Sequence, residues 1–182
     1  IKHFPGQGSA AGDTHMGLVD ITETFSEVEE LRPFRALLGG GRTTEPPDSV
    51  MMSHLLHRSF DSDRPASLSP AMIDGLLRTT LGFNGLVLTD SLDMRAISDR
   101  FPAGEAAILA LEAGADIALE ANNLARVEAC PAPRIHRDVC AAVRSGRLGR
   151  ESIERSIVRL DAFASTLAAR RERLVSNAEA GR

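Results

Sequence analysis

The stretch GLVLTD at residues 85–90 decides the fold class of this chain. Its apolar residues are continuous rather than alternating, which is typical of a strand buried on both faces of a parallel sheet. A helical pattern that closes at Gly82 precedes this stretch, and another helical pattern over 103–113 follows it. A strand between two helices indicates a βαβ unit.

The same alternation extends along the rest of the chain. Short apolar runs at 1–5, 49–54 and 116–120 predict three further strands, and helical patterns cover 135–145 and 150–169. Alternation of this kind implies right-handed βαβ units and a parallel sheet. About four βα units plus C-terminal helices fit either a small open α/β sheet or half of an eight-stranded barrel of ~250 residues. The pattern alone does not choose between the two.

Two helix starts carry capping signals. Ser26, with Glu29 three residues later, fits a capping box, and the helix that it opens is expected to end or restart at Pro33. Ser69 followed by Pro70 fits an N-cap residue and a proline in the first helical turn.

Composition and charge exclude several classes of function. The 21 basic and 25 acidic residues give a net charge of −4, so no basic surplus is available for a phosphate backbone and nucleic acid is not an expected partner. No apolar run approaches the ~18 residues of a membrane span. Cys130 and Cys140 are too few for a disulfide framework or a zinc site, and we expect neither metal nor cofactor. The chain begins at Ile1 rather than Met, so this sequence does not show whether a signal peptide precedes it. The compartment is therefore unknown, and the cytoplasm is favoured.

Polar side chains stand where the predicted strands end. In both parallel architectures, functional groups gather at the C-terminal ends of the strands. Lys2 and His3 mark the first strand, His54 the second and Asp90 the third. The Asp90 carboxylate can be a nucleophile or metal ligand, or it can cap the following helix, and position alone leaves both open. His54 is either a core histidine satisfied by the backbone or a site residue.

The segment Asp13-Thr14-His15 is a second candidate. An aspartate two residues from a histidine can orient the imidazole and favour its protonated form, which gives a proton donor near neutral pH. The alternative, which spacing alone favours, is an Asx turn. The preceding loop 6–12 is rich in small residues and is expected to be mobile. His57 and His136 are interpreted as surface or loop residues.

Six motifs in order carry a family resemblance: KHFPG at 2–6, DTH at 13–15, MMSH at 51–54, RPASLSP at 64–70, LGFNG at 81–85 and TDSLDM at 89–94. Over about residues 1–121 the chain resembles glycoside hydrolase family 3, in particular its bacterial β-N-acetylglucosaminidase branch. The resemblance implies a (β/α)8 TIM-type barrel. Residues 1–169 are then expected to form the C-terminal half of the catalytic barrel, followed by a charged tail, 170–182, that is expected to fray.

The resemblance also implies roles for individual residues. Lys2 and His3 correspond to a pair that binds sugar hydroxyls, Asp90 to the catalytic nucleophile, and Asp13 and His15 to a dyad whose histidine is the general acid/base. The implied mechanism is retaining hydrolysis in two displacements. His54, at the neighbouring strand end, is kept as a further candidate for substrate binding.

The expected function is removal of terminal β-linked N-acetylglucosamine, with cell-wall peptidoglycan fragments as the substrate class. The alternatives are a family 3 β-glucosidase or β-xylosidase, a glycoside phosphorylase, or a non-catalytic half-barrel that needs a complementary chain. Two departures from the family pattern stand out: Gln7 replaces the usual histidine, and the first four βα units are absent. Because a half-barrel exposes sheet edges, we expect the missing half to come from a longer chain or from self-association.

Overall fold

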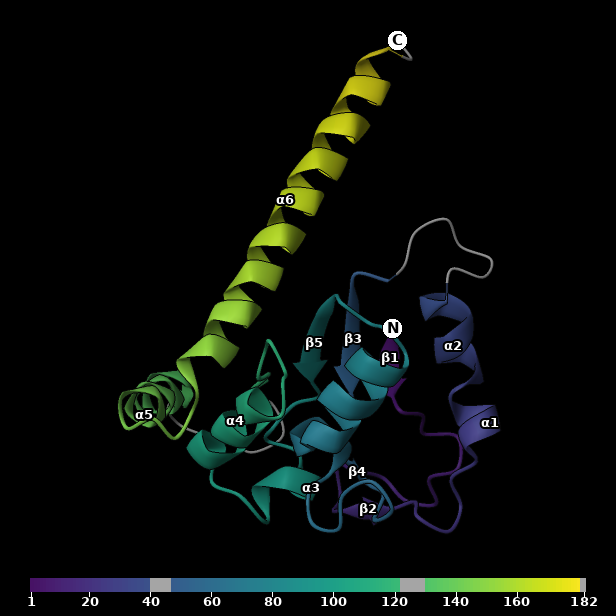
Figure 1. The fold of residues 1–182 in the computed structure, drawn as a ribbon, viewed down its shortest axis with the longest axis vertical. Coiled ribbons are helices and arrows are strands. Elements are labelled where there is room, and N and C mark those ends of the chain that lie inside the picture. The colour runs from purple at the N-terminus through teal and green to yellow at the C-terminus, as the bar shows by residue number, and fades with distance from the viewer. Residues whose placement is uncertain (40–46, 122–129, 181–182) are drawn as a thin grey trace.

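A parallel sheet of three short strands forms the centre of the fold in the computed structural model, which describes residues 1–39, 47–121 and 130–180 (Figure 1). The strands are β1 (Lys2–Phe4), β3 (Ser49–Met52) and β5 (Leu86–Thr89), in that spatial order. A second parallel pair joins β2 (Val19–Asp20) to β4 (Leu55–Leu56). The strands predicted at 1–5, 49–54 and 85–90 are therefore confirmed.

The fourth predicted strand, at 116–120, is reduced to a single bridge between Ile117 and Leu88 of β5. The Ile117 N–H donates to the Val87 carbonyl at 3.2 Å, as in a ladder. Two residues later, the Leu119 N–H donates to the Thr89 hydroxyl at 3.0 Å and not to a backbone carbonyl. The ladder stops here because a side chain takes the donor that a longer strand needs.

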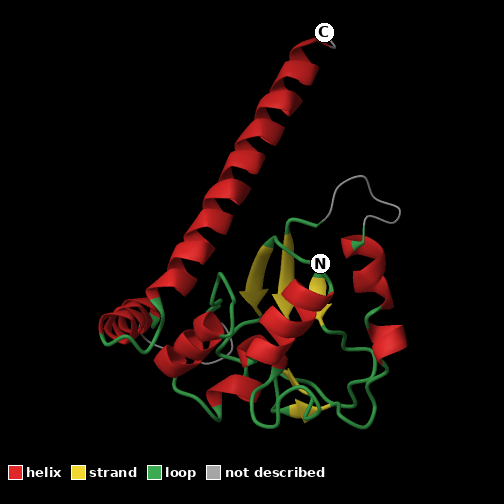
Figure 2. Cartoon of the chain, viewed as in Figure 1, coloured by secondary structure: helices red, strands yellow, loops and turns green. Residues whose placement is uncertain are grey.

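Helices connect the strands along the chain and lie around the sheet in space (Figure 2). They are α1 (Glu27–Glu30) and α2 (Arg32–Leu38) before β3, η1 (Ala66–Leu68) and η2 (Ala71–Thr80) before β5, and then α3 (Arg95–Ser98), α4 (Ala103–Glu112), α5 (Ala132–Arg144) and α6 (Arg150–Ala180). The order of strands and helices is the parallel α/β order that the sequence predicts.

The capping signals mark real helix starts. The Ser26 hydroxyl accepts from the Glu29 N–H at 3.4 Å, and α2 begins with Pro33 in its first turn. The Ser69 hydroxyl likewise accepts from the Met72 N–H at 3.4 Å, at the start of η2.

Helix η2 differs from the expected α-helix because it is a π-helix, with hydrogen bonds that span five residues. The hydroxyls of Thr79 and Thr80 follow the same spacing, since they donate to the carbonyls of Asp74 and Gly75. Its apolar face is nevertheless buried, as the predicted spacing requires.

Helix α6 continues beyond the predicted limit of 169 and ends at Ala180, projecting away from the sheet (Figure 1). Alanine, leucine, arginine and glutamate dominate this stretch, and all are strong helix formers. Arg170 also donates to Asp48, next to β3, at 2.6 Å. The segment 170–180 is therefore helical in the structure, while the fraying of this tail and the division of the chain at 169 stay predictions. Among the described helices, none has the length and hydropathy to cross a membrane.

The core fixes where the strands end. Phe4 of β1 packs edge to face on Phe34 of α2, with ring centroids 5.0 Å apart. Val50 of β3 and Val87 of β5 are fully buried, and Leu77 of η2 belongs to the same cluster. Burial on both faces is what the continuous apolar run at 85–90 predicts.

Candidate active site

A cavity of about 420 Å³ lies at the carboxyl ends of β1 and β5. Five of the six site residues predicted from the sequence line it; the full lining is Lys2, His3, Gln7, Ala10, Gly12, Asp13, Thr14, His15 and Asp90. The strands are parallel, so residues distant in sequence reach the same edge of the sheet.

Asp90 extends the end of β5 by one residue. Its N–H donates to the Met52 carbonyl at 3.0 Å, and its carboxylate Oδ1 accepts from the Ser91 N–H at 2.8 Å. The other oxygen, Oδ2, lies 3.5 Å from His3 Nε2, and 19% of the side chain is exposed. Since the cap of α3 is Met94, Asp90 does not cap that helix. One carboxylate oxygen is therefore held by the backbone and the other lies beside a histidine in the cavity wall.

His3 is the neighbour of Asp90 across the sheet. Burial lowers the pKa of His3, and Lys2 adds to this effect, while Asp90 opposes it. The Gln7 side chain forms a hydrogen bond with His3. Gln7, which replaces the histidine usual in the family, therefore keeps a polar contact within the site. With its pKa below the ordinary 6.5, His3 is mainly neutral at pH 7 and can both donate and accept a hydrogen bond.

Asp13 and His15 form a tight pair. His15 Nδ1 lies 2.7 Å from Asp13 Oδ1, and the His15 N–H donates to the same oxygen at 2.9 Å. These two bonds lower the pKa of the Asp13 carboxyl, so it is ionised near neutral pH. The structure therefore contains both the Asx turn and the contact that orients the ring, while the role of His15 as a proton donor stays a prediction. With Nδ1 occupied, Nε2 is the ring nitrogen left to exchange a proton with a ligand.

The loop that carries this dyad is tied to the rest of the fold on both sides. The Thr14 carbonyl accepts from the Ala96 N–H at 3.2 Å, and Thr14 itself is buried. Glu30 accepts from the backbone N–H groups of Gly8 and Ser9, at 3.2 and 2.6 Å. Sequence analysis missed Glu30, because an acidic residue in the run EVEE is an ordinary feature of a first helical turn.

His54 does not line the cavity. It has no exposed surface, its Nδ1 lies 2.7 Å from the Ser67 hydroxyl, and its Nε2 lies 2.9 Å from the Ser91 carbonyl. Burial lowers the pKa of His54. Of the two interpretations left open by the sequence, this geometry is that of the core histidine. It supports the residue next to Asp90 and offers no free ring atom to a ligand.

His57 is a loop residue, as predicted, but it is buried and not at the surface. Its ring lies between Phe25 and Phe60, edge to face, with both centroid distances 4.9 Å. Phe25 is distant from His57 in the sequence, and Phe60 lies nearby in a polar loop. No local pattern therefore predicts this packing. Within the described ranges, no group of three or more His, Cys, Asp or Glu is placed to hold a metal ion.

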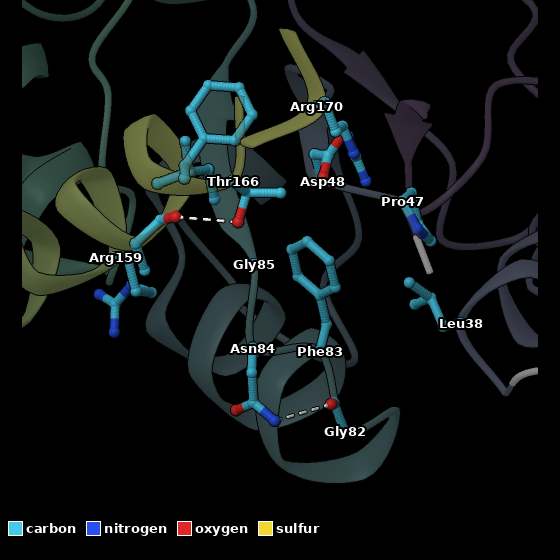
Figure 3. Close-up of a pocket in the computed structure, with 13 residues that line it drawn as sticks. Leu38, Pro47, Asp48, Gly82, Phe83, Asn84, Gly85, Arg159, Thr166 and Arg170 are labelled. Atoms are coloured by element: carbon cyan, nitrogen blue, oxygen red, sulfur yellow. Dashed lines mark hydrogen bonds and ion pairs between the residues drawn. The ribbon is translucent and has the colours of Figure 1, made fainter. Parts of the chain in front are cut away.

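A second cavity, of about 490 Å³, lies at the opposite ends of the strands, between residues preceding β3 and β5 and one side of α6 (Figure 3). Asp48 and Arg170 meet here, and the Asn84 amide turns back to the Gly82 carbonyl. None of the predicted site residues lines this cavity. The predicted residues therefore gather at one end of the sheet.

Comparisons with known proteins agree with this geometry. Residues 1–162 match the model of the glycosyl hydrolase family 3 N-terminal domain. Beta-hexosaminidase LpqI of Mycobacterium tuberculosis is 39% identical over 167 residues, which cover 88% of this chain and 40% of the relative. The chain thus spans about two fifths of that relative's length.

Solved structures give the same match in three dimensions. The structure of Mycobacterium tuberculosis LpqI has a TM-score of 0.76 at 38% identity. The match covers 89% of this chain and 46% of the LpqI chain. A family 3 β-N-acetylglucosaminidase from a Paenibacillus species has a TM-score of 0.77 at 37% identity, with 91% of this chain and 30% of that chain covered. The parallel α/β arrangement thus matches a TIM-barrel-type domain and not a small open sheet. The chain belongs to glycoside hydrolase family 3, within the region known as its N-terminal domain.

Proposed function

We propose that this chain carries the reacting groups of a retaining glycoside hydrolase that removes terminal β-linked N-acetylglucosamine, with peptidoglycan fragments as its substrate class. The observation that supports this most directly is that Lys2, His3, Asp13, His15 and Asp90 line one cavity. The relatives named beta-hexosaminidase support the choice of an amino sugar over glucose or xylose.

In the first displacement, Asp90 is the nucleophile. The Ser91 N–H holds Oδ1, so Oδ2 is the oxygen available to bond the anomeric carbon. As that bond forms, the bond from the anomeric carbon to the leaving oxygen breaks. His15 gives its Nε2 proton to the leaving oxygen. The Asp13 carboxylate lies 2.7 Å from Nδ1 and so orients the imidazole ring for this donation from Nε2.

In the second displacement, His15 acts in the opposite direction. Its neutral Nε2 takes a proton from water, and the water oxygen bonds the anomeric carbon. The bond to Asp90 breaks and the carboxylate is restored. Two inversions leave the anomeric configuration unchanged.

Lys2 and His3 hold the sugar beside Asp90. A neutral His3 offers one donor and one acceptor to neighbouring hydroxyls, and Lys2 offers up to three donors. Because His3 Nε2 is 3.5 Å from Asp90 Oδ2, a hydroxyl bound to His3 lies next to the nucleophile.

The test is release of a fluorophore from a β-N-acetylglucosaminide by the wild-type protein and by Asp90→Ala, with circular dichroism to verify folding. Because the chain spans about two fifths of a relative's length, the pair is compared both in this chain and in a full-length protein that contains it. We expect turnover that depends on Asp90, and a β-anomeric product by NMR. Undiminished turnover in Asp90→Ala, or an α-anomeric product, contradicts the proposal.

A parallel reaction in inorganic phosphate tests the phosphorylase alternative, since phosphorolysis gives a sugar 1-phosphate in place of the free sugar. A matched β-glucoside tests the β-glucosidase alternative. We expect the N-acetylglucosaminide in phosphate to give mainly free N-acetylglucosamine and not its 1-phosphate, and we expect the β-glucoside to turn over more slowly than the matched N-acetylglucosaminide.

A further inference from the structure

The loop between β1 and β2 carries Asp13 and His15, and a glutamate from a different element holds its first half. Glu30 Oε1 accepts from the Ser9 N–H at 2.6 Å, and Oε2 accepts from the Gly8 N–H at 3.2 Å. Two consecutive backbone donors thus bind the two oxygens of one carboxylate. Hydrogen bonds to an ionised acceptor are about twice as strong as bonds between neutral groups.

The glycines of the loop are matched to this carboxylate. Gly6 has φ of +137°, a conformation that side chains rarely adopt, and a Cβ there would overlap Glu30 Oε2. A Cβ at Gly8 would lie only 3.3 Å from Oε1. The close approach of Glu30 to the loop therefore depends on glycine at position 6 and is aided by glycine at position 8.

Glu30 is itself fixed by the core. It is the last residue of α1, where its N–H donates to the Ser26 carbonyl at 2.8 Å. The next residue, Leu31, is fully buried, and Phe34 follows in contact with Phe4 of β1. The Glu30 carboxylate thus ties the loop to the core that positions β1.

On its far side, the loop is tied at Thr14, between the two members of the dyad. The Thr14 carbonyl accepts from the Ala96 N–H at 3.2 Å, and Thr14 is 4% exposed. The side chains of Asp13 and His15 are more than half exposed and bind each other. Their place in the cavity is therefore set by the two ties of the loop backbone.

We propose that Glu30 is a positioning residue for the acid/base step: by binding the N–H groups of Gly8 and Ser9, it holds His15 at the working distance from Asp90. This role rests on the proposed function, because His15 needs a fixed distance only if it exchanges protons with the substrate. Glu30 does not touch the substrate in this account. Its removal therefore affects proton transfer more than sugar binding.

The first experiment uses Glu30→Ala and Glu30→Gln, with Glu29→Ala as the matched control. Glu29 is the adjacent acidic residue, exposed and paired with Arg32. The value of kcat/KM reports the first displacement, and it is measured with two N-acetylglucosaminides. In one substrate the leaving group is 2,4-dinitrophenolate, which leaves without a proton. In the other the leaving group is a second sugar, whose oxygen needs the proton from His15.

We expect Glu30→Ala to lower kcat/KM by about 10- to 100-fold for the sugar leaving group, part of the full effect of a general acid, and by less than about threefold for dinitrophenolate. Glu30→Gln keeps one acceptor oxygen and is expected to lie between Glu30→Ala and the wild type. Added azide, which attacks the anomeric carbon without a general base, is expected to raise kcat of Glu30→Ala. Equal losses for the two leaving groups overturn the proposal, because a general disturbance of the site predicts that result.

The second experiment measures the loop without any substrate. Amide hydrogen exchange at Gly8 and Ser9 is expected to rise by about tenfold or more in Glu30→Ala and to stay unchanged in Glu29→Ala. Unchanged exchange at both amides overturns the proposed role of Glu30. If the wild-type protein is inactive but Glu30→Ala still raises the exchange at Gly8 and Ser9, the proposed function alone is contradicted. The two failures are therefore distinguishable.

Discussion

Two carboxylates at opposite ends of strand β5 have contrasting surroundings. At the carboxyl end, Asp90 is 19% exposed, binds one backbone N–H and lies 3.5 Å from a single histidine nitrogen. At the other end, the Asp116 side chain has no exposed surface. It accepts four hydrogen bonds, from Arg78 at 2.8 Å, the Val87 N–H at 2.9 Å, Ser156 at 2.7 Å and Arg159 at 2.9 Å.

The difference separates a reactive carboxylate from a structural one. Each oxygen of Asp116 accepts two hydrogen bonds, and two guanidinium groups balance its charge, so neither oxygen is free to attack a substrate. Asp90 keeps one oxygen in a cavity, 3.5 Å from Nε2 of the mainly neutral His3. An incompletely paired carboxylate in a cavity at the carboxyl end of a strand favours function, whereas a fully paired buried one favours stability.

The largest expected effect is the loss of activity in Asp90→Ala. If Asp90 is the nucleophile, kcat falls on the order of 10⁵-fold, which is the scale of loss when a catalytic nucleophile is removed from other enzymes. The free energy of unfolding is expected to change by less than about 1 kcal/mol, because few contacts are lost. Hydrolysis assays and urea denaturation measure the two quantities, with Asp99→Ala as an exposed control. A large loss of stability with modest loss of activity would give Asp90 a structural role.

Asp116→Ala is expected to show the opposite pattern. Removing one partner of a buried ion pair leaves Arg78 and Arg159 uncompensated, which costs about 3–5 kcal/mol of unfolding free energy. Urea denaturation followed by circular dichroism measures this loss. Where the variant still folds at low temperature, its kcat per folded molecule is expected to stay within about threefold of the wild type. A change below about 1 kcal/mol would refute the account of Asp116.

His15→Ala sharpens the comparison at the active end. We expect kcat/KM to fall by about 10²- to 10⁴-fold for substrates with a poor leaving group, as is usual for loss of a general acid. Asp13→Asn keeps an acceptor for Nδ1 but loses the charge, and is expected to have a smaller effect, of about tenfold. Equal activity in His15→Ala and the wild type on a disaccharide would exclude His15 as the acid.

The smallest expected effect is the dependence of stability on pH. Burial holds the pKa of His54 below 6.5 in the folded protein, so the unfolded chain takes up the proton first as the pH falls. This contribution to stability is complete well above pH 6.5 and is lost below it, by up to about 1.4 kcal/mol between pH 6.5 and 5.5. Urea denaturation at pH 7.5 and 5.5 is expected to show a smaller difference for His54→Asn. A stability that rises toward pH 5.5 would contradict this sign.

Local sequence carries most of the information about the active end. A continuous apolar run predicts β5 and therefore the position of Asp90, and the DTH spacing predicts a contact between Asp13 and His15. Contacts between distant residues are invisible at that level. Glu30 is 22 and 21 residues from its donors Gly8 and Ser9.

The opposite end illustrates the same limit. Asp116 is 38 and 43 residues from Arg78 and Arg159, and nothing near DIALE in the sequence indicates those partners. The π-helical form of η2 also escapes prediction, because its apolar positions satisfy an α-helical spacing equally well. Sequence therefore predicts strand ends and local dyads, whereas the pairing that makes one carboxylate reactive and the other inert requires the fold.

The most direct test of Asp90 as a nucleophile is capture of the covalent intermediate. His15→Ala is incubated with the 2,4-dinitrophenyl β-N-acetylglucosaminide, in which the first displacement needs no acid and the second lacks its base. Mass spectrometry of the digested protein is expected to find one N-acetylglucosaminyl group esterified to Asp90. A burst of dinitrophenolate with no sugar on Asp90, or with the sugar on a different residue, would contradict the account.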